Sequence, residues 1–391
     1  MVRVIKWILG LALAAVLLGL AGFLIFAPGI AERRMNVVKT HESYPVSSEA
    51  AAFHDSLVVG DWHADTLLWK RDPLKKSDRG HVDLPRLIEG NVTLQVFTAV
   101  TKSPSGLNYE ENSAEAFDNI TLLAVGQLWP PRTWTSLLER ALFQAERLRD
   151  AVARSNGRLR LIRTEGDLDA VLALDASGEN VVGGILGIEG AHPLEGDIAN
   201  LDRLEAAGYR LVGLQHFFDN ELGGSLHGAG NHGLTDFGRQ VVAEVAARGM
   251  VLDLAHSSAQ VARDVLDMTD IPLIVSHTGV FSHCETTRNF PDDLMVDIAE
   301  TGGLIGIGYW EDVTCDDSPA GVAQTIKAAV ELLGDDHVAL GSDYDGTVTT
   351  AFDTAELASL TQAMLDVGLT EAQIRKVSGE NMIRVLRDRL N

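Results

Sequence analysis

Seven histidine and acidic side chains occur just after short apolar runs of the chain, at the same relative position on six of these runs. One such residue alone is weak evidence, because a lone histidine after a strand is commonly a hydrogen-bonded structural residue. Imidazole and carboxylate groups together are the ligands that zinc and similar divalent metals take in proteins. A convergent set therefore predicts a metal centre that activates water and polarises a carbonyl group. The seven residues are His63, Asp65, Glu189, His216, His256, His277 and Asp343.

The first members of this set lie in the motif "GDWHAD". His63 and Asp65 are two residues apart, so on a strand both side chains point to one face and Ala64 points to the other. Three histidines and two carboxylates suffice for two divalent ions if one carboxylate bridges them, and the site keeps a net positive charge. The same spacing recurs at His81 and Asp83 before a helix, where we expect helix capping and no metal.

The elements that would position these side chains are eight short runs rich in β-branched residues and leucine, typical of strands buried on both faces. Helical patterns alternate with them, for example at residues 236–249, 258–270 and 320–336. This repeat predicts an α/β protein with a (β/α)8 barrel, whose active site lies at the carboxyl ends of the strands. A doubly wound open sheet gives a similar alternation, but no G-x-G-x-x-G motif follows any run, which weakens that reading. The predicted strands are residues 57–60, 93–100, 181–188, 210–214, 250–254, 273–276, 304–308 and 338–341.

The chain of 391 residues is long enough for one large barrel. We expect residues 35–55 to form a connector with a short entry helix and residues 56–391 to form the barrel. A helical insertion is expected at about 101–160, between the second and third predicted strands. It either packs on the barrel as decoration or contributes to a substrate lid or a dimer contact.

The N-terminal region is strongly apolar: residues 7–31 contain no charged side chain. This stretch is long enough to cross a hydrocarbon core about 30 Å thick. A cleaved signal peptide has an apolar region of only about 7–15 residues, so we expect residues 1–34 to form an uncleaved transmembrane anchor. A signal segment is the alternative. Basic residues flank both ends, and we expect the catalytic part to lie outside the cytoplasm, in the bacterial periplasm.

The formal net charge of -23 argues against a nucleic-acid partner, which needs a basic face. With 46% hydrophobic and 22% charged residues, the composition is that of an ordinary globular protein. Cys284 and Cys315 are the two cysteines. One disulfide is possible in an oxidising compartment, but the sequence does not place their Cα atoms within reach of each other.

Several segments that carry these residues resemble the membrane dipeptidases, the renal dipeptidase-like M19 metallopeptidases of the amidohydrolase-like superfamily. The resemblance covers about 57–390 and includes "GDWHADTLL", "GILGIEGAH", "PLIVSHTGVFSHCETTRNFPDDLM" and "VALGSDYDG". The His-x-Asp of the first motif is the most specific element, because relatives in the wider superfamily carry His-x-His there. The resemblance implies a TIM-like metal-dependent hydrolase barrel. It also implies a zinc-dependent dipeptidase, which hydrolyses the peptide bond of dipeptides through a metal-bridging hydroxide.

The resemblance further implies two zinc ions. His63, Asp65 and Glu189 would hold one of them. Glu189 would bridge to the second ion, which His256 and His277 would also bind.

The remaining site residues receive roles from the same resemblance. His216 would stabilise the tetrahedral oxyanion. Arg288, in "TTRNFPDD", would bind the terminal carboxylate of the substrate. Asp343 would take a proton from the bridging water and pass it to the leaving amine. The expected partners are a dipeptide or a similar carboxylate-bearing amide, the membrane through the N-terminal helix, and a second copy of the chain in a homodimer.

Two alternatives stay open. A hydrolase of N-acyl amino acids or related amides would use the same dinuclear site and the same Arg288. A non-catalytic barrel that binds a ligand is disfavoured, because the ligand set is intact. The first motif commonly reads His-Asn-Asp followed by Leu-Pro in the family, whereas this chain has "HADTLL". Ala64 points away from the metal side of a strand, so we expect this departure to leave the ligands in place.

Overall fold

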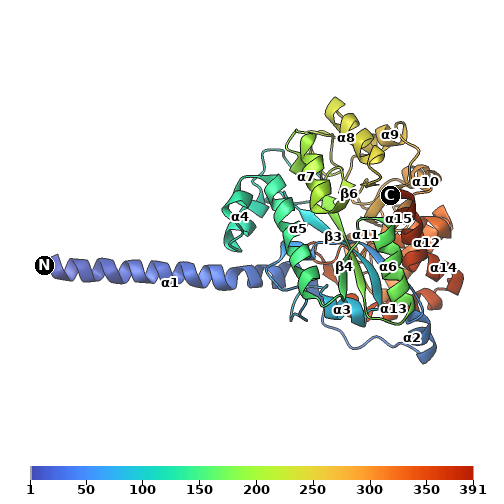
Figure 1. Ribbon diagram of the computed structural model, residues 1–391, viewed down its shortest axis with the longest axis horizontal. Helices are drawn as coiled ribbons and strands as arrows, with labels where there is room; N and C mark the ends of the chain where they lie inside the picture. Colours follow the sequence, from blue (N-terminus) through green and yellow to red (C-terminus); the bar gives the residue numbers. More distant parts are fainter. Residues whose placement is uncertain (1, 391) are drawn as a thin grey trace.

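The computed structural model describes residues 2–390 and contains a closed parallel barrel surrounded by helices (Figure 1). Within these residues the main sheet has the order β3-β2-β10-β9-β8-β7-β6-β5-β4, and β3 also pairs with β5 to close the barrel. The predicted (β/α)8 fold is therefore confirmed. The barrel strands are β2 (Val59–Ala64), β3 (Val92–Val100), β5 (Val182–Glu189), β6 (Tyr209–Gly213), β7 (Val251–Asp253), β8 (Leu273–Thr278), β9 (Leu304–Ile307) and β10 (Val338–Leu340).

All eight predicted strands coincide with barrel strands to within a few residues. The largest difference is in β2, which begins and ends later than the predicted 57–60, so that His63 lies inside the strand. Three further strands of two or three residues are too short to show a sequence period. They are β1 (Val37–Val38), which pairs with β11 (Thr349–Thr350), and β4 (Leu159–Leu161), which pairs with the start of β5.

The interior of the barrel explains why only one end is open. Leu94 and Val96 of β3 belong to a cluster with Trp62 and Ile185, while the alternate residues of the strands face the surrounding helices. The cluster continues into Met382 of α15 (Asn381–Arg389), the last helix of the chain. Apolar side chains thus fill the barrel interior at the amino ends of the strands, and the polar site residues lie at the carboxyl ends.

The helices begin where the sequence offers a capping residue. Ser258 caps α9 by accepting a hydrogen bond from Val261 N at 3.1 Å, and Ser318 caps α12 in the same way. The predicted insertion contains two helices, followed by β4 and α6. The helices around the barrel are α2 (Ser48–His54), α3 (Leu84–Glu89), α4 (Asn119–Gly126), α5 (Leu137–Arg154), α6 (Glu165–Ala176), α7 (Ala199–Ala207), α8 (Asp236–Ala247), α9 (Ala259–Leu266), α10 (Asp292–Glu300), α11 (Glu311–Thr314), α12 (Pro319–Leu333), α13 (Leu357–Asp366) and α14 (Glu371–Arg375).

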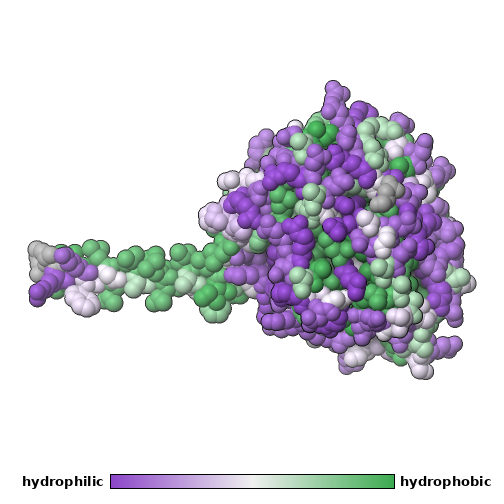
Figure 2. Space-filling view, in the orientation of Figure 1, coloured by the Kyte–Doolittle hydropathy of each residue, from purple (hydrophilic) through white to green (hydrophobic). Residues whose placement is uncertain are grey.

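The N-terminal helix α1 (Val2–Met35) projects from the barrel as a single rod (Figure 1). Its surface is apolar along most of its length (Figure 2). Within residues 2–390 it is the one helix long and apolar enough to span a membrane, with a mean hydropathy of 2.7. Its last turns reach the barrel, where the Glu32 carboxylate accepts hydrogen bonds from Arg71 Nε at 2.6 Å and Arg79 Nε at 2.7 Å.

Candidate metal centre

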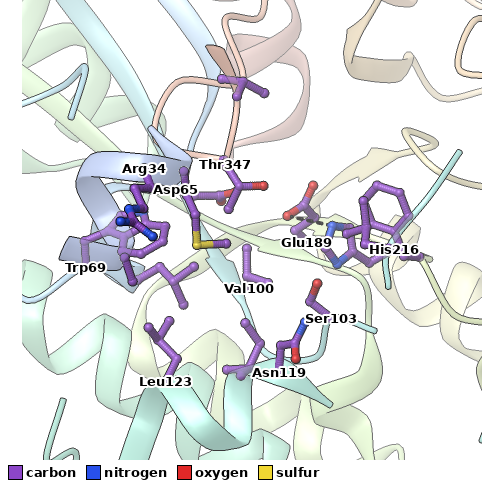
Figure 3. A pocket seen from close by; sticks show the side chains of 18 of the residues that line it. Arg34, Asp65, Trp69, Val100, Ser103, Asn119, Leu123, Glu189, His216 and Thr347 are labelled. Carbon is purple, nitrogen blue, oxygen red and sulfur yellow. Dashed lines mark ion pairs between the residues drawn. The ribbon is translucent and has the colours of Figure 1, made fainter. Parts of the chain in front are cut away.

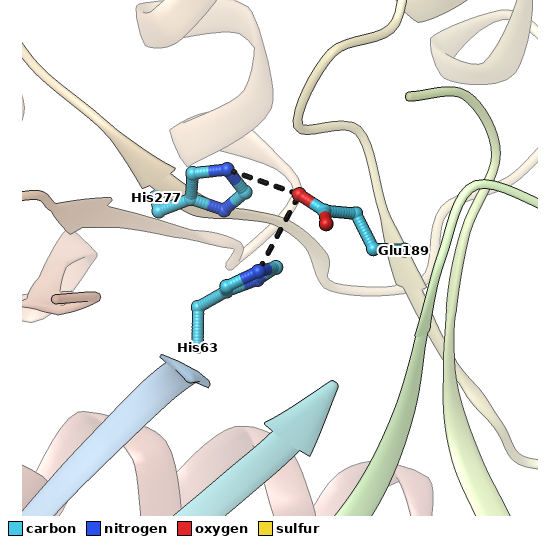
Figure 4. Close-up of side chains that lie close together, drawn as sticks. All are labelled: His63, Glu189 and His277. Atoms are coloured by element: carbon cyan, nitrogen blue, oxygen red, sulfur yellow. Dashed lines mark ion pairs between the residues drawn. The ribbon is translucent and has the colours of Figure 1, made fainter. Parts of the chain in front are cut away.

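The carboxylate of Glu189, at the end of β5, lies at the centre of the cluster that the sequence predicts. Its Oε1 atom is 3.4 Å from His63 Nε2, 3.2 Å from His256 Nε2 and 3.5 Å from His277 Nε2. Figure 4 shows His63 and His277 approaching this oxygen from two other strands, β2 and β8. Three imidazoles therefore converge on one carboxylate oxygen at the carboxyl end of the barrel.

The remaining predicted residues surround this core. His216 Nε2 is 3.4 Å from the second oxygen of Glu189. Asp65 Oδ1 is 3.5 Å and Asp343 Oδ1 is 4.0 Å from His63 Nε2. The structure thus brings all seven residues together. They form three overlapping groups whose ligand atoms lie within 4.8 Å of one another: His63 with Glu189 and His277, Glu189 with His216 and His256, and His63 with Asp65 and Asp343.

Local backbone geometry contributes to this convergence. Glu189 keeps the regular alternation of β5, whereas His63 and His277 lie where the pairing of β2 and of β8 shifts register, between Asp61 and Ala64 and between Val275 and Thr278. His256 and Asp343 follow their strands in the left-handed region, with φ of 62° and 58°. This conformation is costly for residues other than glycine and clusters at functional sites.

The charges of the cluster favour a cation. Burial opposes protonation of His63, but Glu189 and Asp65 outweigh it and raise the pKa of His63 to about 10. Burial raises the pKa of Asp343 to about 8 and that of Glu189 well above its usual value. The side chains of the cluster thus supply too little positive charge to keep these carboxylates ionised, and a divalent cation would supply that charge.

The donor atoms also fit a metal. His63 Nε2 and Glu189 Oε2 are buried and have no hydrogen-bond partner within residues 2–390. The Nε2 atoms of His256 and His277 are 2.9 Å apart, with both rings buried. Nitrogen lone pairs that face one another and a carboxylate form the donor set of a divalent metal site. We conclude that these residues fit such ions.

Sequence reasoning missed Ser276, which precedes His277 and positions two rings. Its Oγ atom is 3.2 Å from His63 Nδ1 and 2.9 Å from His277 Nδ1. Since the Nε2 atoms face the site, the Nδ1 atoms carry the protons, and the serine oxygen accepts a hydrogen bond from each of them. A buried Asp253 carboxylate in turn accepts a hydrogen bond from Ser276 N at 2.9 Å. A serine next to a histidine has no spacing that would reveal this role.

The second His-x-Asp motif has the structural role that the sequence predicts for it. Asp83 caps α3 by accepting a hydrogen bond from Arg86 N at 3.0 Å. His81 contacts the loop after β10, where its backbone N donates to Asp345 Oδ1 at 2.7 Å. That carboxylate also accepts a hydrogen bond from Thr66 Oγ1 at 2.7 Å and therefore fixes the loop that carries Asp343.

The guanidinium of Arg288 lines the cavity beside the cluster and is buried. It donates from Nη2 to His277 O at 2.9 Å, while its Nε atom has no partner within residues 2–390. A buried donor of this kind suits a carboxylate ligand. Cys284 and Cys315, whose pairing the sequence left open, form a disulfide with a Cα–Cα distance of 5.6 Å, and it fastens the loop that carries Arg288.

Comparison with known families agrees with this geometry. The family model described as membrane dipeptidase (peptidase family M19) matches residues 34–390. The dipeptidase aclJ of Aspergillus oryzae is 34% identical over 53% of this chain and 51% of its own length. The dipeptidase tcpJ of Claviceps purpurea is 27% identical over 79% of this chain and 69% of its own length. The chain therefore spans about half the length of the first of these relatives.

Solved structures show the same fold. The dipeptidase AC, a metallopeptidase of family M19, superimposes with a TM-score of 0.67 at 26% identity, over 86% of this chain and 99% of its own. A metallopeptidase of Rhodobacter sphaeroides, bound to a phosphinate mimic of the dipeptide L-Ala-D-Ala, gives 0.65 at 26% identity over 86% of this chain and 99% of its own. The likeness to an amidohydrolase of Pseudomonas aeruginosa, at 20% identity and a TM-score of 0.68 over 87% of this chain and 99% of its own, concerns the fold alone.

Proposed function

The chain belongs to the membrane dipeptidase family, peptidase family M19, and on this premise we propose that it hydrolyses the peptide bond of dipeptides with two zinc ions. The observation that carries the proposal is the convergence of three imidazole Nε2 atoms within 3.5 Å of one Glu189 oxygen. The buried Arg288 beside them offers a free donor for a substrate carboxylate.

Three metal ligands of this proposal lie on barrel strands, and the other two, Asp65 and His256, follow the ends of strands β2 and β7. His63, Asp65 and Glu189 would hold one ion, and Glu189, His256 and His277 would hold a second. Thr98 Oγ1 donates to Asp65 Oδ1 at 2.6 Å and thereby fixes the carboxylate that approaches His63 Nε2. Zinc ions bound here would lower the pKa of water and polarise the scissile carbonyl.

Three residues of the chain act on the substrate. The guanidinium of Arg288 binds the carboxylate and orients the peptide. The ring of His216 is held by a hydrogen bond from Nδ1 to Lys102 O at 3.1 Å, and its Nε2 atom is directed into the site, 3.4 Å from Glu189 Oε2. Because Nδ1 carries a proton and burial lowers the pKa of His216 to about 4, Nε2 is unprotonated in the resting site, and it would donate to the oxyanion after it takes up a proton as negative charge develops. Asp343 takes a proton from the attacking water and passes it to the leaving amine.

We also propose that α1 is an uncleaved anchor and that the barrel lies outside the cytoplasm. The apolar length of α1 and the disulfide between Cys284 and Cys315 support this location, because disulfides persist in oxidising compartments. The positions of Phe23, Ala27 and Ala31 in the lining of the cavity support retention of the helix, since cleavage before Glu32 would remove these apolar side chains.

Metal analysis combined with a dipeptide panel tests the proposal. The purified full chain is expected to retain two zinc ions and to hydrolyse dipeptides with L- or D-residues at the carboxyl position. His256→Ala should lose metal and at least 100-fold in kcat/KM, whereas His232→Ala, at an exposed histidine, should keep both. A protein that holds no divalent metal, or a His256→Ala variant with full activity, contradicts the proposal.

A further inference from the structure

A cavity of about 790 Å³ extends from the metal centre to the inner end of α1. At one end it is lined by the site residues Glu189, His216 and Arg288. Figure 3 shows Glu189 and His216 on one side of this space and Trp69 and Leu123 on the other. The cavity is therefore longer than the catalytic cluster requires, and its far part belongs to other elements.

The far part has an apolar wall built from three segments. The first is the inner end of α1, where residues spaced four apart share one face of the helix. The second is α4, and the third comprises the ends of β3 and of the short helical turn after β2. We call this surface the acyl wall, and it consists of Phe23, Ala27, Ala31, Leu68, Trp69, Val100, Ile120, Leu122 and Leu123.

Barrel topology fixes where the acyl wall lies relative to the substrate carboxylate. Arg288 follows β8, whereas Val100 is the last residue of β3. In the closed order of strands, four steps separate β3 from β8 in either direction, so the two residues lie on opposite sides of the barrel mouth. A substrate whose carboxylate binds Arg288 therefore extends across the metal centre with its acyl side toward the acyl wall.

The acyl wall also lies where α1 would enter a membrane. Residues 7–21 of α1 are exposed and apolar and project away from the barrel (Figure 2). Phe23 and Leu122, at the rim of the cavity, remain 60% and 62% exposed. Large apolar side chains that line a cavity and stay exposed mark a surface for an apolar ligand. The cavity therefore opens at the level of the lipid surface.

We propose that the substrate is an amide with a free carboxylate on its amine side and a long alkyl or acyl chain on its acyl side, taken from the lipid surface along the acyl wall. This inference rests on the hydrolytic function proposed above and narrows its substrate class. Water adds its oxygen to the carbonyl carbon, the carbon–nitrogen bond breaks, and the nitrogen takes up the proton. The products are a long-chain carboxylic acid and an amino acid, and no oxidant is consumed.

The test uses the full zinc-loaded chain in lipid nanodiscs. The probes are dipeptides with alanine at the carboxyl position and a linear N-terminal side chain that grows from methyl to butyl to decyl. N-Acetylalanine and N-dodecanoylalanine form a second pair. Released alanine gives kcat/KM. Each methylene that reaches the acyl wall should raise kcat/KM by up to about fourfold, equivalent to about 0.8 kcal/mol.

Variants of α4 localise the effect. Leu123→Gln should lower the ratio of long-chain to short-chain kcat/KM at least tenfold, because it places an amide on the acyl wall. Val125→Gln is the matched control, since Val125 lies on the same helix but does not line the cavity. Circular dichroism establishes that both variants are folded.

The outcomes separate this inference from the function on which it rests. If alanyl-alanine is hydrolysed but kcat/KM stays constant or falls as the side chain lengthens to decyl, the proposed role of the acyl wall is wrong and the dipeptidase function stands. If none of the probes is hydrolysed, the dipeptidase function fails. The acyl wall is then judged by calorimetry on the metal-free chain, where N-dodecanoylalanine must bind at least tenfold more tightly than N-acetylalanine or the inference is wrong.

Discussion

The carboxylate of Glu32, in the last turns of α1, accepts a hydrogen bond from Arg71 Nε at 2.6 Å, and both side chains are buried. Arg71 also contacts the carboxylate of Asp345, which lies two residues after Asp343. A chain of charged contacts therefore joins the membrane-directed helix to the loop that carries a proposed catalytic residue. The helix and the barrel form one packed unit at this point.

Glu32→Ala should destabilise this unit, because it leaves the buried Arg71 with only one of its two carboxylate partners, Asp345. We expect a loss of about 1–3 kcal/mol in the free energy of unfolding, measured by denaturant titration of the full chain in detergent. Limited proteolysis should cut residues 36–47 faster than in the unmodified protein. Glu42→Ala, at an exposed glutamate of the same connector, is the control. Equal stability of the two variants would show that the pair does not hold α1.

Ser276→Ala should weaken metal binding without removing a ligand. The hydroxyl oxygen lies 3.2 Å from His63 Nδ1 and 2.9 Å from His277 Nδ1, so its loss frees both rings to rotate. Loss of such an outer contact costs about 10- to 100-fold in metal affinity. Competition with a chromophoric chelator measures the zinc affinity. Ser282→Ala, at an exposed serine, should match the unmodified protein, and a Ser276→Ala chain that does so as well refutes the positioning role.

The parts of the molecule that the sequence predicts are those that depend on a local period. The barrel strands are buried on both faces and read as apolar runs, and Glu189 and His277 stand directly at their ends. Contacts between distant segments carry no such period. The pairing of Glu32 with Arg71 and the contact of Ser276 with His63 arise only when segments far apart in the sequence pack together. Strands of two or three residues, such as β1 and β4, could not be predicted from the sequence for the same reason, because they are defined by pairing with a neighbouring strand.

The disulfide should stabilise the barrel mouth. Cys284 and Cys315 close a loop of 31 residues that includes Arg288. By chain entropy, a loop of this size contributes about 3–4 kcal/mol, so Cys315→Ser should lower the free energy of unfolding by that amount. KM for dipeptides should rise more than kcat falls, because the loop positions the carboxylate-binding guanidinium. Dithiothreitol should reproduce both effects in the unmodified chain and change nothing in the variant, and an unchanged KM would separate the disulfide from substrate binding.

The buried His54 should make the free energy of unfolding depend on pH, independently of the metal centre. This histidine of α2 is buried, with Nε2 at 3.1 Å from Gly90 O and Nδ1 at 2.9 Å from Thr361 Oγ1. The carbonyl accepts from Nε2, so neutral Nδ1 accepts from the threonine hydroxyl. Burial lowers the pKa of His54 below its ordinary value of 6.5, although the hydrogen bond to Gly90 opposes the shift. The folded chain therefore binds fewer protons at this site than the unfolded chain below pH 6.5.

Linkage then gives the sign of the effect. The stability associated with neutral His54 is complete above pH 6.5 and falls as the pH drops from there toward the folded pKa, by up to about 1.4 kcal/mol per unit of pKa shift. Denaturant titrations of the metal-free chain between pH 5 and 8 measure this slope. His54→Gln should flatten it, because glutamine retains a donor and an acceptor but does not titrate. His283→Gln, at an exposed histidine, provides the comparison, and equal slopes in the two variants would exclude His54 as the acid-sensitive group.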